Sequence, residues 1–227
     1  LVSRRSRQDA SCKEYSPLAI SPCRGGIMCE VPASFGDPVI AEQESVLYTP
    51  LESYLLGGFF TLHKPKHGSL RPVTAQTAQR SAAGGGTWTQ PDVAAVFVSR
   101  SKFATAAEIR LFSFEVKTRH GCQLQSVHEA LAHTRFVNSS YLVWNRPRCI
   151  CQDREFYLTI EKNCAAYGVG LITVHDPGNL STFEVRLAAQ RKDIAADDMD
   201  EFISTRFDAH KQDLIIEALT NFFPRPL

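Results

Sequence analysis

Residues 108–117 read EIRLFSFEVK, and this stretch decides the fold. Its β-branched and aromatic residues favour an extended strand, in which alternate side chains point to opposite faces of a sheet. One face then carries Arg110, Phe112, Phe114 and Val116, and the other carries Ile109, Leu111, Ser113, Glu115 and Lys117. The sequence therefore predicts a strand over residues 109–117 that ends with a carboxylate and an amine on the same face.

A second strand is predicted over residues 91–98, which read PDVAAVFV. The short connection between the two strands indicates an antiparallel hairpin. If Val98 lies opposite Ile109, then Asp92 falls opposite Glu115, and directly opposed side chains in a sheet are about 5 Å apart. The hairpin thus predicts two carboxylates and Lys117 together at one end of a sheet.

The rest of the chain alternates between helical and extended patterns. The stretch LYTPLESYLLGGFF (residues 47–60) predicts a helix with a capping box formed by Thr49 and Glu52, whereas residues 64–87 read as turn and loop. Helices are also predicted over residues 123–137, 154–168 and 197–223, the last as one helix or a pair, and strands over 140–144, 169–176 and 181–190. This order predicts an α/β fold in which helices flank a mixed β-sheet.

Composition narrows the class of protein. The 227 residues are 44% hydrophobic and 22% charged, with a net charge of +1. The overall charge therefore does not by itself indicate a nucleic-acid partner. No apolar run approaches the length of a membrane helix, and seven cysteines at irregular spacing indicate reduced thiols. We therefore expect a cytoplasmic protein with no membrane partner, with residues 1–40 as an irregular N-terminal tail and residues 41–227 as one domain.

The expected cluster at the hairpin end suits one kind of chemistry. Two close carboxylates stay ionised most easily with a cation between them, and ligation by oxygen alone favours Mg²⁺, with Mn²⁺ as a substitute. Lys117 could then orient or deprotonate an attacking water, or neutralise developing negative charge, as hydrolysis of a phosphodiester requires. The alternative is an ordinary charge pair at a strand end, which contributes little.

These residues also resemble a known family. The dipeptide PD at 91–92 and the motif EVK at 115–117 resemble the PD-(D/E)XK restriction-endonuclease-like nucleases, whose core has the order α-β-β-β-α-β. The segments LYTPLESYL, GGGTWTQPDVAAV, LFSFEVK, NSSYLVW and YGVGLITV, in that order, resemble the HrgA-like bacterial proteins associated with restriction–modification loci. In that group a winged-helix-like domain commonly precedes the nuclease-like part, and residues 1–40 do not resemble it.

The resemblance implies a role for each matching residue. Asp92 and Glu115 would be metal ligands and Lys117 the catalytic lysine. Gln125 and Glu129 would face the site from the following helix, although Glu129 stands where the close group has Gln and a solvated helix face would also explain both. Glu52 would be an acid supplied by the first helix, although its place in a capping box explains it equally well.

Five basic residues could form a rim that contacts phosphates: Arg80, Lys102, Arg119, Arg146 and Arg148. The expected function is a metal-dependent deoxyribonuclease linked to restriction or DNA defence, with DNA as partner and a homodimer as a possible assembly. The alternative is a weak or inactive nuclease-like domain that binds nucleic acid or a protein partner.

The stretch HEALAH (residues 128–133) is not a metalloprotease motif, because its histidines are five residues apart rather than four.

Overall fold

The computed structural model describes residues 43–64, 68–78, 90–104, 106–146 and 154–221. All of them belong to one compact unit, Ile40–Leu227. Within these ranges, no helix has both the length and the apolar character needed to cross a membrane. The predicted tail over residues 1–40 lies outside the described residues.

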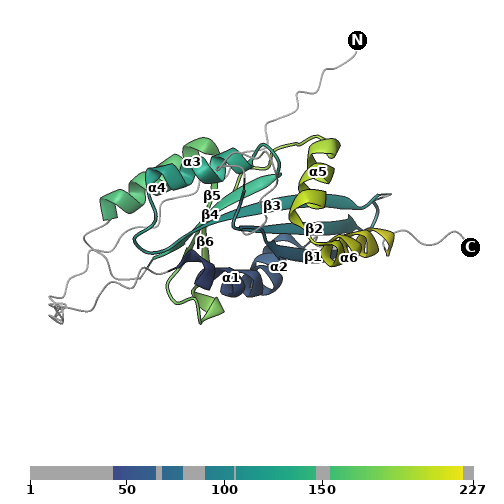
Figure 1. The fold of residues 1–227 in the computed structure, drawn as a ribbon, viewed down its shortest axis with the longest axis horizontal. Helices are drawn as coiled ribbons and strands as arrows, with labels where there is room; N and C mark the ends of the chain where they lie inside the picture. The colour runs from purple at the N-terminus through teal and green to yellow at the C-terminus, as the bar shows by residue number, and fades with distance from the viewer. Residues whose placement is uncertain (1–42, 65–67, 79–89, 105, 147–153, 222–227) are drawn as a thin grey trace, which may run out of the picture. The chain divides into compact units, whose positions relative to one another are not determined.

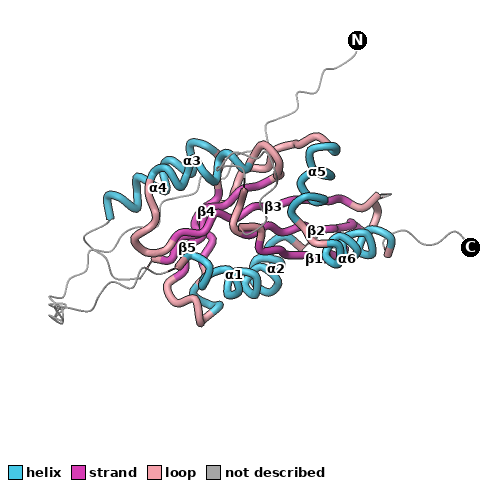
Figure 2. Tube along the Cα trace, viewed as in Figure 1, coloured by secondary structure: helices cyan, strands magenta, loops and turns pink. Residues whose placement is uncertain are grey.

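The described strands form one mixed sheet (Figure 2). Its six strands follow their chain order: β1 (Gly68–Gln76), β2 (Val93–Ser101), β3 (Glu108–Lys117), β4 (Ser139–Asn145), β5 (Gly170–Val174) and β6 (Glu184–Leu187). Strands β1, β2 and β3 pair antiparallel, β3, β4 and β5 pair parallel, and β6 returns antiparallel. The predicted α/β class with a mixed sheet flanked by helices is confirmed.

Helices cover both faces of this sheet (Figure 1). On one face lies a continuous helical segment made of η1 (Glu44–Leu47), α1 (Tyr48–Tyr54), the π-helical η2 (Leu55–Phe59) and α2 (Phe60–His63). The other face carries α3 (Leu124–His133), α4 (Arg154–Tyr167), α5 (Ala196–Arg206) and α6 (Ala209–Thr220). A short 3-10 helix, η3 (Leu180–Thr182), precedes β6.

The two faces of β3 are packed as the alternation predicts. Phe112 and Phe114 point toward the N-terminal helical segment, where the fully buried Phe59 lies edge-on to both rings at 5.8 and 5.6 Å between centroids. Leu111 points to the opposite face and packs in a cluster with Phe202 of α5. Because the strand is buried on both faces, Glu115 and Lys117 lie at the edge of a rigid core rather than on a mobile loop.

Two local predictions are wrong. The helical segment already begins at Glu44, so Thr49 lies inside it and does not cap it. Residues 64–87 include strand β1, although Gly68 and Pro72 suggested a loop. The reason is that β1 is the edge strand of the described sheet, where a proline is tolerated because one side of the strand pairs with no other described strand.

Two turn predictions agree with the structure. Helix α4 ends at Tyr167, and Gly168 follows with a φ of +71°, the left-handed conformation that favours glycine after a helix. The C-terminal pattern is a pair of helices, because Phe207 is extended and the Asp208 carboxylate caps α6 by accepting a hydrogen bond from Lys211 N at 2.8 Å. Helix α3 is shorter than predicted and ends at His133.

Candidate active site

Asp92 and Glu115 meet at one end of the β2–β3 hairpin. Val98 pairs with Ile109 and Val93 pairs with Phe114, as the predicted register requires. One residue before β2, Asp92 N donates to Phe114 O at 3.2 Å and Asp92 Oδ2 accepts from Val116 N at 2.8 Å, so Asp92 lies beside the Phe114–Val116 end of β3. Asp92 and Glu115 both line one cavity, together with Gln125 and Glu129 of α3.

Asp92 is fixed by two hydrogen bonds. Its Oδ1 accepts from the Tyr48 hydroxyl at 2.6 Å, and its Oδ2 accepts from Val116 N at 2.8 Å. Burial raises the pKa of Asp92, and these two hydrogen bonds act in the opposite direction. Both oxygens keep a free lone-pair direction, because a carboxylate oxygen can accept more than one bond. The carboxylate is therefore oriented but not saturated.

Lys117 lies at the centre of a ring of carboxylates. Its Nζ is 2.7 Å from Glu115 Oε1, 3.1 Å from Glu129 Oε2 and 3.4 Å from Glu44 Oε1. Burial alone would lower the pKa of Lys117, but Glu115 and the other carboxylates outweigh it and raise the pKa above its ordinary value. Lys117 is therefore a protonated donor at neutral pH and not a base.

The Glu115 carboxyl is buried in a site that disfavours its ionised form. Its side chain is only 9% exposed, and burial together with the nearby charge of Asp92 raises the pKa of Glu115 to about 8. The ammonium of Lys117 counteracts only part of this cost. An additional cation next to Glu115 and Asp92 would relieve it, because opposite charge within about 4–6 Å favours the ionised form.

This shift predicts how stability depends on pH in the presence of a chelator. Between pH 4.5, the ordinary pKa, and about 8, the folded chain keeps a proton on Glu115 that the unfolded chain has lost. Stability contributed by Glu115 therefore falls as pH rises through this window, by at most about 1.4 kcal/mol per pH unit. Urea unfolding of wild type and Glu115→Gln from pH 5 to 8 should show this slope in the difference between the two proteins. A difference that is flat, or that rises with pH, would contradict the assignment.

Helix α3 brings the two predicted helix residues to the same place. Gln125 Nε2 donates to Glu129 Oε1 at 2.9 Å, and Glu129 Oε2 faces Lys117. Burial would raise the pKa of Glu129, but its hydrogen bond with Lys117 and the lysine charge lower it. The structure thus places Gln125 and Glu129 beside Asp92, Glu115 and Lys117, as the resemblance led us to expect.

These side chains surround a polar cavity of about 320 Å³, which we call the carboxylate cavity. It is lined by Gln90, Asp92, Glu115, Lys117, Gln125, Glu129 and His133. A second hollow of about 190 Å³ shares Lys117, Gln125 and Glu129 with it and continues toward the loop before α3. The volume is large enough for a phosphate group and several waters.

Glu52 is not part of this site, and that prediction is wrong. Its Oε2 accepts from Gln76 Nε2 at 2.8 Å, and its Oε1 is 3.9 Å from Lys211 Nζ, so it faces β1 and α6. The acid that the N-terminal helical segment supplies is Glu44. Eight residues separate the two along the helical segment, a rise of about 12 Å at 1.5 Å per residue, so both cannot reach the same lysine.

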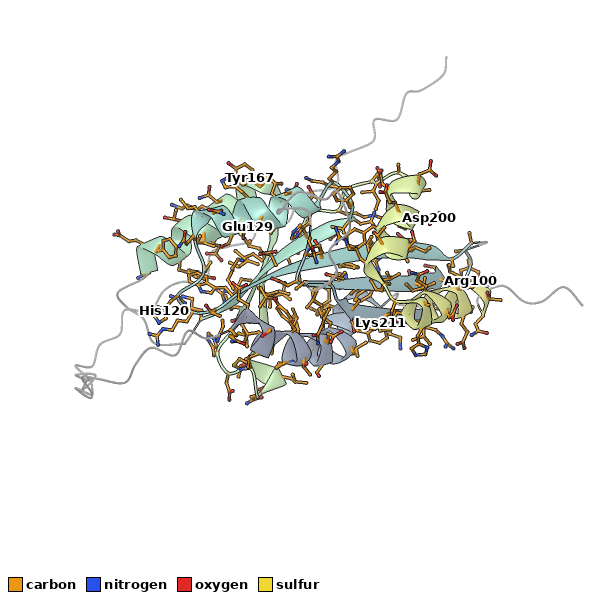
Figure 3. The ribbon with its side chains drawn as sticks, in the orientation of Figure 1. Arg100, His120, Glu129, Tyr167, Asp200 and Lys211 are labelled. Atoms are coloured by element: carbon orange, nitrogen blue, oxygen red, sulfur yellow. The ribbon has the colours of Figure 1, made fainter. Side chains whose placement is uncertain are left out.

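The five predicted rim residues do not all come together. Lys102 lies in the β2–β3 turn, about 30 Å from Asp92 at 3.3 Å per residue, so the structure does not bring it to the site. Figure 3 shows this separation: Arg100, near that turn, and His120, just beyond β3, lie at opposite ends of the sheet. Arg80 and Arg148 fall outside the described residues.

Arg119 and Arg146 lie at the same sheet end as Lys117. Trp144 pairs with Lys117 across β3 and β4, and its Nε1 donates to Arg119 O at 3.4 Å. The Arg146 guanidinium stacks over Tyr157 at 4.3 Å and over Trp144 at 5.8 Å. These contacts fix the Arg146 guanidinium two residues after Trp144, the residue of β4 that pairs with Lys117.

Sequence reasoning missed three residues that the structure places in this cluster: Glu44, Tyr48 and His133. A signal existed for His133, since Gln125, Glu129 and His133 are spaced by four and therefore share one helix face. Glu44 and Tyr48 had no comparable signal, because the segment before Thr49 was not predicted to be helical.

The donor set suits a hard divalent cation. Asp92 and Glu115 offer carboxylate oxygens, which are the ligands that Mg²⁺ and Mn²⁺ prefer. Burial raises the pKa of both carboxyls, and a cation between them would favour their ionised forms. In the described ranges, no three His, Cys, Asp or Glu side chains already form a group that could hold a metal ion. Glu115 Oε1 is 2.7 Å from Lys117 Nζ, so a cation bound by that oxygen would compete with this contact.

Comparison with known proteins does not assign the chain to a family. No family model matches it, and no curated protein matches it. What the site can do therefore has to be inferred from its own geometry.

Proposed function

We propose that the protein is a metal-dependent deoxyribonuclease that hydrolyses phosphodiester bonds, with a role in restriction or DNA defence. One observation carries the proposal: Asp92, Glu115 and Lys117 converge from two paired strands on one polar cavity. Two carboxylates and a protonated amine in a partly enclosed site are the groups that phosphodiester hydrolysis requires. A divalent cation held by Asp92 and Glu115 would supply Lewis-acid activation of the phosphate and of water.

The order of elements gives further support. From the N-terminal helical segment through β1, β2, β3 and α3 to β4, the chain has the order α-β-β-β-α-β, which is the order that the resemblance to PD-(D/E)XK nucleases implies. Strand β1, which our sequence reasoning assigned to a loop, completes this order. PD lies just before β2 and EVK at the end of β3, so the two motifs stand at one end of neighbouring strands.

Within this proposal the chain's own residues have distinct roles. Asp92 is oriented by Tyr48 and Val116, so it presents a fixed carboxylate. Lys117 is protonated and would donate to a phosphate oxygen, stabilising charge as water forms its bond to phosphorus and the bond to the leaving oxygen breaks. Glu129 and Gln125 would orient Lys117 and the attacking water. Arg146, stacked on Tyr157, would contact a neighbouring phosphate of the strand.

A second candidate is favoured by one observation. Lys117 is already paired with three carboxylates, and one of them, Glu129, stands where the resembled group has Gln. An additional negative charge opposes the approach of a phosphate, which would suit a domain that binds nucleic acid or a protein partner without cutting.

Incubation of the full chain with DNA separates the two candidates. We expect cleavage of at least one substrate among plasmid, single-stranded and 5-methylcytosine-containing DNA when Mg²⁺ or Mn²⁺ is present, and none with EDTA. The products should be resolved on a denaturing gel, so that single-strand nicks are counted. If every substrate stays intact with both metals while a mobility shift shows binding, the non-catalytic candidate is correct.

A further inference from the structure

One side chain that lines the carboxylate cavity has a buried nitrogen without a hydrogen-bond partner among the described residues. His133, the last residue of α3, is only 1% exposed, yet it lines the cavity together with Asp92 and Glu115. Its Nδ1 is buried and has no hydrogen-bond partner among the described residues. Its Nε2 is 3.7 Å from Glu115 Oε2. A buried polar group without partners is uncommon and calls for an explanation.

The missing partner at Nδ1 decides where the imidazole proton lies. Nδ1 has no acceptor among the described residues, whereas Nε2 faces the Glu115 carboxylate at 3.7 Å. A buried N–H without an acceptor is rarer and costlier than a buried lone pair without a donor. The proton therefore belongs on Nε2, the nitrogen that faces Glu115, and a protonated Nε2 cannot bind a metal ion.

We propose that His133 is a positioning residue that donates its Nε2–H to Glu115 Oε2 and thereby leaves Glu115 Oε1 to face the cavity. This inference rests on the proposed function, in which Glu115 holds a cation. A separation of 3.7 Å exceeds a direct hydrogen bond, but active-site contacts are often long before ligands bind and then tighten, and a cavity water can bridge the gap. When His133 fixes Glu115 Oε2, less conformational entropy is lost as Glu115 Oε1 is oriented toward a cation.

The first test uses three replacements with different donor positions. His133→Gln can place an amide N–H near the position of Nε2, His133→Asn places it near Nδ1 instead, and His133→Leu has none. We expect Mn²⁺ affinity, measured by titration calorimetry on the full chain, to fall about 10- to 100-fold in His133→Leu and His133→Asn, the loss typical of a residue that supports a metal ligand. His133→Gln should remain within about threefold of wild type, because it keeps the donor. Equal losses in all three variants would overturn the proposal.

The second test reads the histidine itself and needs no metal. In chelator at neutral pH, ¹⁵N-resolved spectra of the wild-type protein should show a neutral ring with its proton on Nε2. Glu115→Gln should shift the Nε2 resonance and leave Nδ1 nearly unchanged. A proton on Nδ1, or an Nε2 chemical shift that is the same in wild type and Glu115→Gln, would overturn the proposal. If wild type binds no Mn²⁺, the proposed function fails while these spectra still decide the role of His133.

Discussion

In the proposed nuclease, metal-dependent cleavage should fall by about 10³-fold when Lys117 is replaced with alanine, since the variant would lose the protonated amine proposed to stabilise charge on the phosphate. Initial cleavage rates at saturating Mg²⁺ would measure the loss. Lys117→Arg is informative beside it, because it keeps the positive charge among Glu44, Glu115 and Glu129 but not the compact ammonium. We expect it to keep the folded structure and to lose most of the activity.

The control for this loss lies at the other end of the hairpin. Lys102→Ala removes a lysine from the β2–β3 turn, where the amine contacts only the Phe103 ring at 5.2 Å among its described interactions. It should cleave as wild type does. Circular dichroism and urea unfolding would verify that Lys117→Ala is folded. This check is needed because Glu44, Glu115 and Glu129 lose the positive charge that they share in the wild-type protein. Cleavage that persists in folded Lys117→Ala would show that the site is wrongly assigned.

The second large effect concerns the cation. Asp92→Asn and Glu115→Gln should each lower Mn²⁺ affinity by at least about 100-fold, because a ligand loss exceeds the 10- to 100-fold loss typical of supporting residues. Asp92→Asn also replaces one acceptor with a donor, facing either Tyr48 or Val116 N, so some loss of stability is expected. Titration calorimetry below the unfolding transition would measure the affinity.

Glu52→Gln is the matched control for these two variants. Sequence reasoning named Glu52 as a metal ligand, but the structure places it against Gln76 and Lys211. Its replacement should leave Mn²⁺ affinity unchanged. If Glu52→Gln weakened binding as strongly as Glu115→Gln, the N-terminal helical segment would have to supply Glu52 rather than Glu44 to the site.

Local patterns were sufficient to predict the hairpin end. Strict alternation over β3 fixed which side chains share a face, and the predicted pairing of Val98 with Ile109 brings Asp92 to the same end of the hairpin as Glu115. These relations depend on a period of two and a short connection, so they can be read along the chain. Gln125 and Glu129 were named from the resemblance, and their spacing of four residues is consistent with one helix face.

The remaining features depend on where elements start and what they pack against. Glu44 reaches Lys117 because the chain is helical four residues before Tyr48, and nothing in the polar stretch before Leu47 indicated this. Strand β1 was missed because its proline and glycine read as a turn unless the strand is known to be at an edge. The role of His133 depends on a cavity that only the packed fold creates.

The most direct test of the central claim is anomalous diffraction from crystals of the protein soaked in Mn²⁺. We predict one strong anomalous peak in the carboxylate cavity that contacts both Asp92 and Glu115, with Lys117 Nζ displaced from Glu115 Oε1. Crystals of Glu115→Gln treated in the same way should lack it. A cavity without a peak, in which Lys117 still holds Glu115 at full Mn²⁺ concentration, would contradict the metal-dependent nuclease and favour a domain that binds without cutting.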